Sequence, residues 1–204
     1  MNRPRTRIQQ KNSETILDAA LDVFSAKGFR GATLDQIAEV AGLSKPNLLY
    51  YFPSKEAMHS ALLGNLLDTW LDPLRAMDPD GDPMEEIMGY VRSKLEISRD
   101  YPRESRLFAN EILQGAPHMR AAIETDLKAL VAEKTKVLQT WMDAGKIAPM
   151  PPVHLIFSIW ALTQHYADFD TQVRAVLGPD HDPFTEADGF LQLLFRRLLQ
   201  VADQ

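Results

Sequence analysis

The sequence predicts an all-α fold of about nine helices, and three observations lead to that prediction. Apolar residues recur at helical spacing along most of the chain, whereas the alternation of apolar and polar residues that is typical of strands is nearly absent. The Asp-Gly pairs at 80–81 and 188–189 lack the flanking alternation that a hairpin needs.

The 204-residue chain contains no cysteine, so disulfides, thiolate nucleophiles and cysteine-based metal sites are excluded.

The first predicted helix covers residues 13–27. Ser13 is a suitable N-cap, and Gly28 follows the helix at the position where a left-handed conformation is favoured. Residues 1–12 precede it and are expected to form a flexible basic arm, with a merely solvated terminus as the alternative. The basic residues of this arm are Arg3, Arg5, Arg7 and Lys11.

Two short helices follow, joined by a tight turn. Thr33 caps a helix over 34–41, Gly42 supplies the turn, and Ser44 caps a helix that reaches about Tyr51. Two short helices with so short a connection must cross at a steep angle. The pattern is that of a helix-turn-helix module.

A long fourth helix begins at the Ser54 cap and runs to about Ala76. The strongest break in the chain is the stretch 77–83, which is rich in Asp, Pro and Gly. We therefore expect a helix-turn-helix DNA-binding domain over 13–53 and a larger helical domain over 54–204. The helices predicted after the break cover residues 84–100, 103–114, 118–145, 152–170 and 184–202.

Charge is distributed unevenly along the chain. The net charge is −6, but residues 1–60 hold 8 basic and 6 acidic residues, while the remainder holds 14 basic and 22 acidic ones. A basic end on an acidic protein is the electrostatic pattern expected when only that end contacts a polyanion.

The third predicted helix has one buried and one exposed face. Leu48 and Phe52 are four residues apart and share the buried face, so the exposed face and N-terminal end are polar. Lys and Asn side chains there can pair with guanine and adenine edges in a major groove, and helix N-termini bind phosphate. A structural module without DNA is the alternative. The predicted DNA-binding residues are Thr33, Ser44, Lys45, Pro46, Asn47, Tyr50, Tyr51 and Lys55.

The segments 24–33, 37–44 and 49–56 together resemble the signature of the TetR family of transcriptional regulators. They read FSAKGFRGAT, IAEVAGLS and LYYFPSKE. The resemblance covers about residues 12–60. It implies a TetR-like fold with a three-helix head, a C-terminal ligand-binding and dimerisation domain, operator DNA and a homodimer as partners, and a ligand-responsive repressor function without enzymatic activity.

Further segments are similar to the pyrimidine-utilisation (Rut-type) regulators within that family. These include 66–74, 94–102, 105–108, 126–128 and 154–169. This resemblance implies control of pyrimidine metabolism, with uracil or thymine as the effector. A different small aromatic or apolar effector is the alternative, because related regulators keep similar frames while changing ligands.

A pyrimidine base would need aromatic faces for its ring and polar groups for its edge. Trp160 lies four residues before Gln164, so both side chains share one helix face, and an amide can pair with one donor and one acceptor of the base. Ordinary core packing is the alternative for each tryptophan. The predicted ligand-binding residues are Asp68, Trp70, Lys94, Ser98, Trp160 and Gln164.

The last two predicted helices carry broad apolar faces that a two-fold four-helix interface would bury. The alternative is that these faces close the core of a single chain. The predicted interface residues are Leu155, Ile159, Tyr166, Leu191, Leu194, Phe195 and Leu198.

Other functions find little support in the sequence. There is no phosphate-binding glycine loop and no nucleophile elbow, so an enzyme is not expected, and an adaptor without a ligand is the remaining alternative. The five histidines are scattered and the acidic loop 78–82 lacks the calcium-binding Glu, so neither a cofactor nor a metal is expected. No secretory signal or long apolar run is evident, which predicts a cytoplasmic protein.

Overall fold

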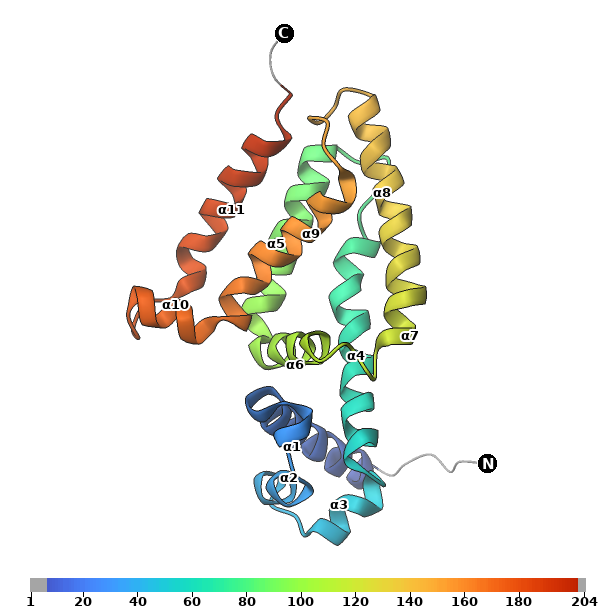
Figure 1. Ribbon diagram of the computed structural model, residues 1–204, viewed down its shortest axis with the longest axis vertical. Helices are drawn as coiled ribbons and strands as arrows, with labels where there is room; N and C mark the ends of the chain where they lie inside the picture. The colour runs from blue at the N-terminus through green and yellow to red at the C-terminus, as the bar shows by residue number, and fades with distance from the viewer. Residues whose placement is uncertain (1–6, 202–204) are drawn as a thin grey trace. The chain divides into compact units, whose positions relative to one another are not determined.

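A computed structural model describes residues 7–201, and all the regular structure in that range is helical (Figure 1). The all-α prediction is therefore confirmed. Residues 1–6 and 202–204 lie outside the described residues, and with them Arg3 and Arg5 of the predicted arm. The helices are α1 (Arg7–Gly31), α2 (Leu34–Ala41), α3 (Lys45–Tyr51), α4 (Lys55–Arg75), α5 (Pro83–Asp100), α6 (Pro102–Leu113), α7 (Arg120–Ala122), the π-helical turn η1 (Ile123–Leu127), α8 (Lys128–Asp143), α9 (Pro152–Asp168), α10 (Asp170–Leu177) and α11 (Pro183–Leu199).

The chain divides into two compact units. The first consists of the residues up to Leu67 together with Arg106–Met119, and the second of Asp68–Ser105 with the chain from Arg120 onward. Helix α4 contributes to both units, so the structural division falls inside this helix rather than at its start.

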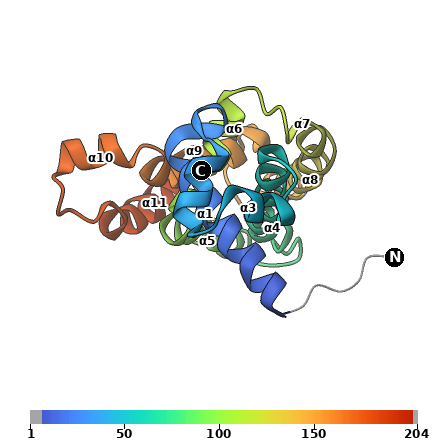
Figure 2. The same cartoon turned by 90° about the horizontal axis from the view of Figure 1, so that it is seen from below.

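The first unit is built around α1, α2 and α3, which Figure 2 shows grouped together. Phe24, Ile37 and Leu48, one from each of these helices, are completely buried. The predicted caps are confirmed for the two short helices: Thr33 forms a reciprocal capping box with Gln36, and Ser44 accepts a hydrogen bond from the Asn47 amide.

Helix α1 begins earlier than the sequence predicts. Arg7 through Asn12 are helical, and Ser13, the predicted cap, is a buried residue in the helix interior. Arg, Gln and Lys are good helix formers, and no Gly or Pro interrupts residues 7–13. Gly28 does take a left-handed φ of 67°, but the chain continues helically to Gly31 beyond this kink.

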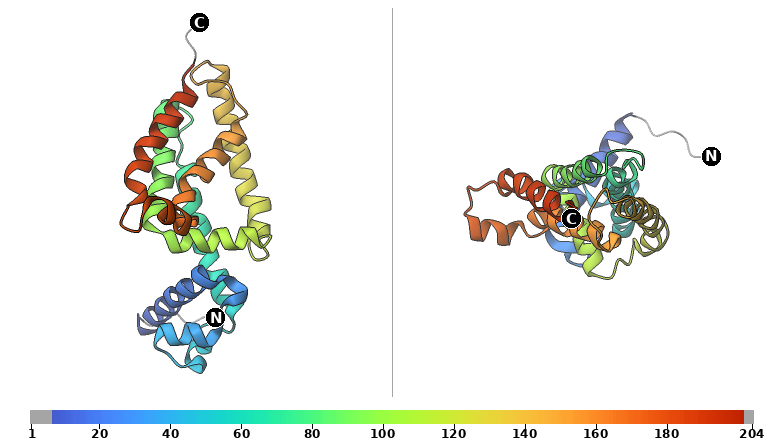
Figure 3. Two further views of the ribbon diagram at one scale, coloured as in Figure 1. Left: turned by 60° about the vertical axis from the view of Figure 1, so that its left-hand side comes forward. Right: turned by 90° about the horizontal axis from the view of Figure 1, so that it is seen from above.

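The second unit is a layered helical bundle. Helix α5 packs against both α9 and α11, and α8 packs against α9 (Figures 1 and 3). Pro183 and the Asp182 cap start α11, whose amide at Phe184 donates to the Asp182 carboxylate. The innermost residues of this core are Leu74, Ile87, Val91, Leu138, Ile147, Ile156, Ile159, Leu191, Phe195 and Leu199.

Four of the predicted interface residues belong to this core. Leu155, Ile159, Leu191 and Phe195 are each at most 2% exposed within the single chain. Their side chains are already covered by the protomer and are not available to a partner, which corrects the sequence assignment. Tyr166 and Leu194 are partly buried and Leu198 is 45% exposed.

Two further parts of the helical pattern differ from the prediction. The predicted helix over 118–145 is divided into α7, η1 and α8, and α10 (Asp170–Leu177) was not predicted. Helix α10 follows a break at Phe169, whose φ of −111° and ψ of 28° are not helical. Among residues 7–201, no helix is both long enough and apolar enough to cross a membrane.

Candidate functional site

The exposed face of α3 carries the residues predicted to read DNA. Lys45, Pro46 and Asn47 occupy the first turn and are exposed, while Leu48 is completely buried beneath them. Tyr50 is 71% exposed one turn later. The Lys45 ammonium lies 3.0 Å from the Asp35 carboxylate of α2, a surface ion pair that costs little to exchange for a phosphate or base.

The start of α1 braces this face. The Asn12 amide donates to the Tyr51 hydroxyl at 2.8 Å, and the Gln9 amide donates to the Tyr50 hydroxyl at 3.4 Å. The two tyrosine rings meet edge to face at 5.2 Å between centroids. Sequence reasoning missed these contacts because it treated residues 1–12 as an arm.

Lys55, at the start of α4, has a structural contact that the sequence did not reveal. Its ammonium donates to the carbonyls of Phe29 and Ala32, both at 2.8 Å, and lies 4.4 Å from the centre of the Phe29 ring. The side chain therefore fastens α4 to the end of α1, directly before the Thr33 cap. Contact with a phosphate would fall to the backbone at the start of α4.

A second polar cluster lies inside the second unit. Lys94 of α5 is 2% exposed, and its ammonium lies 5.3 Å from the centre of the Trp70 ring. Burial lowers the pKa of Lys94 from 10.5 to about 7, although the nearby Asp168 carboxylate acts in the opposite direction. The predicted residues Trp70 and Lys94 are thus brought together.

The cluster continues along facing sides of α5 and α9. The Trp160 indole N–H donates to the Tyr90 hydroxyl at 2.5 Å, and Lys94 is paired electrostatically with Asp168. Burial raises the pKa of the Tyr90 hydroxyl well above its ordinary value. Gln164 lies one helical turn from both Trp160 and Asp168, so the three side chains share one face of α9.

One atom of the cluster has no partner among the described residues. The Trp70 indole N–H is buried and makes no hydrogen bond. An unmade hydrogen bond at a buried donor costs about 1–3 kcal/mol, so this nitrogen is a natural contact for a bound acceptor.

Two predicted ligand residues do not fit such a site. Asp68 is on the surface, where its carboxylate pairs with Arg75 at 3.2 Å. Ser98 is completely buried, and its hydroxyl donates to the Lys94 carbonyl at 3.0 Å. Sequence reasoning missed Tyr90, Ser105 and Asp168 as members of this cluster. The Ser105 hydroxyl donates to the Asp168 carboxylate at 2.5 Å.

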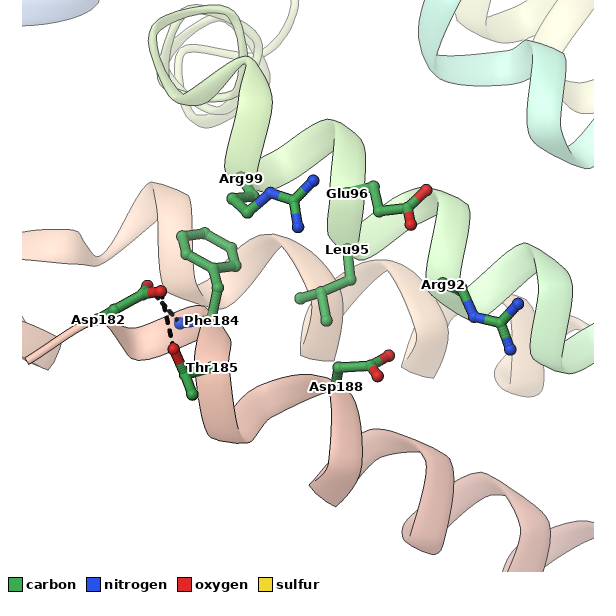
Figure 4. A pocket seen from close by; sticks show the side chains of 8 residues that line it. All are labelled: Arg92, Leu95, Glu96, Arg99, Asp182, Phe184, Thr185 and Asp188. Atoms are coloured by element: carbon green, nitrogen blue, oxygen red, sulfur yellow. Dashed lines mark hydrogen bonds between the residues drawn. The ribbon is translucent and has the colours of Figure 1, made fainter.

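Two depressions open on the second unit. A groove of about 710 Å³ lies between α8 and α9, and its lining is mainly apolar, including Leu127, Val131, Phe157 and Trp160. The other is a charged cleft of about 300 Å³ between α5 and α11 (Figure 4). There the Asp182 carboxylate accepts hydrogen bonds from the Phe184 amide and the Thr185 hydroxyl, so it serves the start of α11 (Figure 4).

Comparisons with known proteins agree with this architecture. The model of the family "Bacterial regulatory proteins, tetR family" matches residues 16–62, and that of the "YcdC-like protein, C-terminal region" matches residues 63–202. The HTH-type transcriptional regulator RutR of Escherichia coli K12 is 55% identical over 174 residues, which are 85% of this chain and 82% of RutR. The HTH-type transcriptional repressor NicS of Pseudomonas putida is 27% identical over 70% of this chain and 66% of its own length.

Solved structures share the fold at low sequence identity. A bacterial regulatory protein of the tetR family from Rhodococcus RHA1 superimposes with a TM-score of 0.74 at 23% identity, covering 95% of this chain and 99% of that one. AibR, solved in complex with isovaleryl coenzyme A and operator DNA, gives a TM-score of 0.72 at 17% identity, covering 90% and 97% of the two chains.

Proposed function

Because the chain belongs to the tetR family of bacterial regulatory proteins, we propose that it is a dimeric repressor that leaves its operator when a pyrimidine base binds. The observation that carries the DNA-binding part is the exposed polar first turn of α3, held over a fully buried Leu48. A rigid helix end with exposed polar side chains suits a major groove. Two such ends in a two-fold dimer would meet half-sites about 34–36 Å apart on a palindromic operator.

The DNA-binding proposal is tested by fluorescence anisotropy with the protein's own promoter DNA. Lys45→Ala and Asn47→Ala are each expected to weaken binding about 5- to 150-fold, because one good base contact is worth about 1–3 kcal/mol. Lys146→Ala is the matched control, since Lys146 is an exposed lysine on the second unit. Unchanged operator affinity in both α3 variants would refute the proposal.

The effector site is proposed at the Trp70–Lys94 cluster. The Lys94 ammonium and the unpaired Trp70 N–H can donate to ring carbonyls, while the Gln164 amide can pair with a neighbouring N–H and carbonyl. Uracil and thymine offer these groups on a flat ring, and the resemblance to pyrimidine-utilisation regulators points to the same ligands. A bound base would give the Trp70 nitrogen the acceptor it lacks.

The effector proposal is tested by calorimetry with uracil and thymine, and by release of labelled operator. Trp70→Phe, which keeps the ring and removes the N–H, is expected to weaken effector binding about tenfold, the equivalent of one lost hydrogen bond. Trp141→Phe is the matched control, because the Trp141 N–H donates to the Pro79 carbonyl at 3.1 Å. Cytosine, whose edge presents a different donor pattern, should bind poorly; equal binding of all three bases would refute the assignment.

A different effector is favoured by one observation. The groove between α8 and α9 has an almost wholly apolar lining and includes Trp160, which also belongs to the polar cluster. A small apolar or aromatic effector could place its body there. Release of the operator by such a compound, with no response to uracil or thymine, would select this alternative.

The dimer is proposed to form through α9 and α11. The outer side of α11 exposes Phe190, Leu193 and Leu198 to 54%, 57% and 45%, and these residues recur at helical spacing. Leu193→Glu is expected to yield monomers in light scattering and to lower operator affinity, because each head would then bind alone. Leu113→Glu, an 82% exposed leucine on α6, is the control that should remain a dimer.

A further inference from the structure

Three metal-ligating side chains meet inside the first unit although they are far apart in the sequence. His59 comes from α4, Glu111 from α6, and His118 from the segment between α6 and α7. One ligand atom from each lies within 4.8 Å of the other two. This group could not be recognised in the sequence, because its first and second members are 52 positions apart.

The ligand atoms of the group are spaced closely enough to share one ion. The Glu111 Oε2 atom lies 3.2 Å from His118 Nδ1 and 4.0 Å from His59 Nδ1. Around a tetrahedral zinc ion with bonds of about 2.0–2.2 Å, neighbouring ligand atoms are about 3.3–3.6 Å apart. Small side-chain rotations would therefore bring all three atoms into coordination.

Burial of the carboxylate and of an unpaired imidazole nitrogen favours a bound cation in this group. The His59 and Glu111 side chains are 1% and 2% exposed, and His59 Nδ1 makes no hydrogen bond to any described residue. A buried carboxylate beside an unpaired imidazole nitrogen is costly unless a positive charge compensates it. The walls are aromatic: the rings of Phe24 and Phe29 lie 4.9 and 4.7 Å from the His59 ring.

Glu111 is oriented by a backbone hydrogen bond, as metal ligands often are. Its Oε1 atom accepts a hydrogen bond of 2.6 Å from the backbone N–H of His118, which leaves Oε2 directed toward the two imidazoles. The His118 side chain is 21% exposed and provides the side from which an ion and a water ligand would enter.

We infer that His59, Glu111 and His118 form a binding site for one divalent first-row metal ion, with zinc as the reference ion. Two imidazoles and one carboxylate leave a fourth position for water, as in open zinc sites. Neutral imidazole nitrogens and carboxylate oxygens are both ligands that divalent first-row metal ions accept. The Lys55 ammonium, which acts electrostatically on His59, is held by the carbonyls of Phe29 and Ala32.

An ion at this site would link α4 to α6, next to the aromatic rings that pack against His59 and precede the Thr33 cap in the chain. The three ligands belong to the first unit, whereas the effector site is proposed in the second. Metal binding would thus adjust the stability of the DNA-reading unit.

The test is a zinc titration of chelator-stripped full-length protein against a chromophoric zinc indicator. One zinc per chain is expected for the wild type, together with a rise in melting temperature on adding zinc. His118→Ala and Glu111→Gln should weaken binding about tenfold or more and abolish that rise, as loss of a ligand does. His181→Ala, a partly exposed histidine remote from the group in sequence, is the matched control.

The His118→Ala variant is expected to fold normally, because the His118 side chain is partly exposed and lies outside the helices. Its circular dichroism and urea midpoint without zinc should match those of the wild type. X-ray absorption of the zinc-loaded wild type should show nitrogen and oxygen ligands at about 2.0–2.2 Å. Zinc affinity and stoichiometry that are unchanged in both ligand variants, or a wild type that binds no zinc, would overturn the inference.

Discussion

Replacement of the buried Lys94 by Met is predicted to make the protein more stable. Burial lowers the pKa of Lys94 from 10.5 to about 7, so the folded state disfavours a charge that the unfolded chain carries freely. Each pKa unit corresponds to about 1.36 kcal/mol, and at pH 7 the shift amounts to a cost of roughly 4 kcal/mol. Methionine fills a similar volume without that cost.

The substitution also removes favourable contacts. The attraction between the Lys94 ammonium and the Trp70 ring contributes about 0.5–2 kcal/mol, which offsets part of the gain. We therefore expect Lys94→Met to raise the free energy of unfolding by about 2 kcal/mol at pH 7. For a chain of this length the melting temperature should rise by roughly 4–8 °C.

The advantage of the variant depends on pH with a definite sign. Because the folded pKa lies below the unfolded one, the unfolded state binds more protons between pH 7 and 10.5. Wild-type stability from this group therefore rises with pH, by about 2 kcal/mol between pH 7 and 9, and the gap to Lys94→Met narrows by the same amount. Urea titrations at the two pH values measure both quantities.

The matched control is the same substitution at the other buried lysine. Lys134 is 4% exposed, but its ammonium donates at 3.0 and 3.1 Å to the carbonyls of Arg75, the last residue of α4, and of Met77, just after it. Lys134→Met would leave those carbonyls unpaired and should cost about 1–3 kcal/mol. If both substitutions destabilise the protein equally at pH 7 and pH 9, the electrostatic reasoning for Lys94 is refuted.

Three further predictions concern the DNA-reading unit. Gly42→Ala should lower the free energy of unfolding by about 1–2 kcal/mol, because Gly42 has a φ of +66° that a residue with a β-carbon adopts only with strain, although the space around it is open. Gly89→Ala inside α5 is the control and should raise the free energy of unfolding by about 0.5–1 kcal/mol. Urea midpoints that shift in the same direction in both variants would contradict this prediction. Lys55→Met should cost about 1.5–3 kcal/mol through the lost carbonyl contacts, and a midpoint equal to the wild type's would show that they contribute nothing. Lys11→Ala should reduce the slope of log affinity against log salt by about 0.9 if Lys11 binds a phosphate, with no change in sequence preference.

Local features of the fold could be predicted from the sequence because their causes lie within a few residues. The Thr33 capping box, the left-handed Gly42 and the Ser44 cap each depend on side chains at most three positions away. The start of α1 could not be predicted in this way. Its first turn is held by the hydroxyls of Tyr50 and Tyr51, which lie 41 and 39 residues away from Gln9 and Asn12 along the chain.

The interface assignment exposes a different limit. Helix α11 has apolar residues on two adjacent faces, so periodicity identifies an apolar helix without saying which face meets the core. The structure places Leu191 and Phe195 inside and leaves Phe190 and Leu198 exposed. The choice depends on how α5 lies against α11, and that geometry is not encoded in the spacing of either helix alone.

The proposed effector site at the Trp70–Lys94 cluster includes two residues that the sequence analysis assigned to a ligand site, but its acidic member was not among those residues. Trp70 and Lys94 are conspicuous in the sequence because tryptophan is large and lysine is charged, and both lie on otherwise apolar helix faces. Asp168, by contrast, resembles an ordinary residue at a helix end. Its role follows only from proximity to Lys94 and Ser105 across the fold. Interactions between segments that are distant in the sequence determine such sites, and these interactions cannot be read from a single sequence.

Two buried side-chain nitrogens within residues 7–201 make no hydrogen bond, and each lies in a different unit. The Trp70 N–H is a donor beside an ammonium, and His59 Nδ1 lies beside a carboxylate. Left unpaired, each would cost about 1–3 kcal/mol, a substantial fraction of the free energy that keeps a domain folded. A donor beside a cation suits an acceptor such as a carbonyl, and an imidazole near a carboxylate suits a cation, so the two nitrogens favour partners of opposite character. The same physical argument therefore supports both the organic effector proposed for one unit and the metal ion proposed for the other.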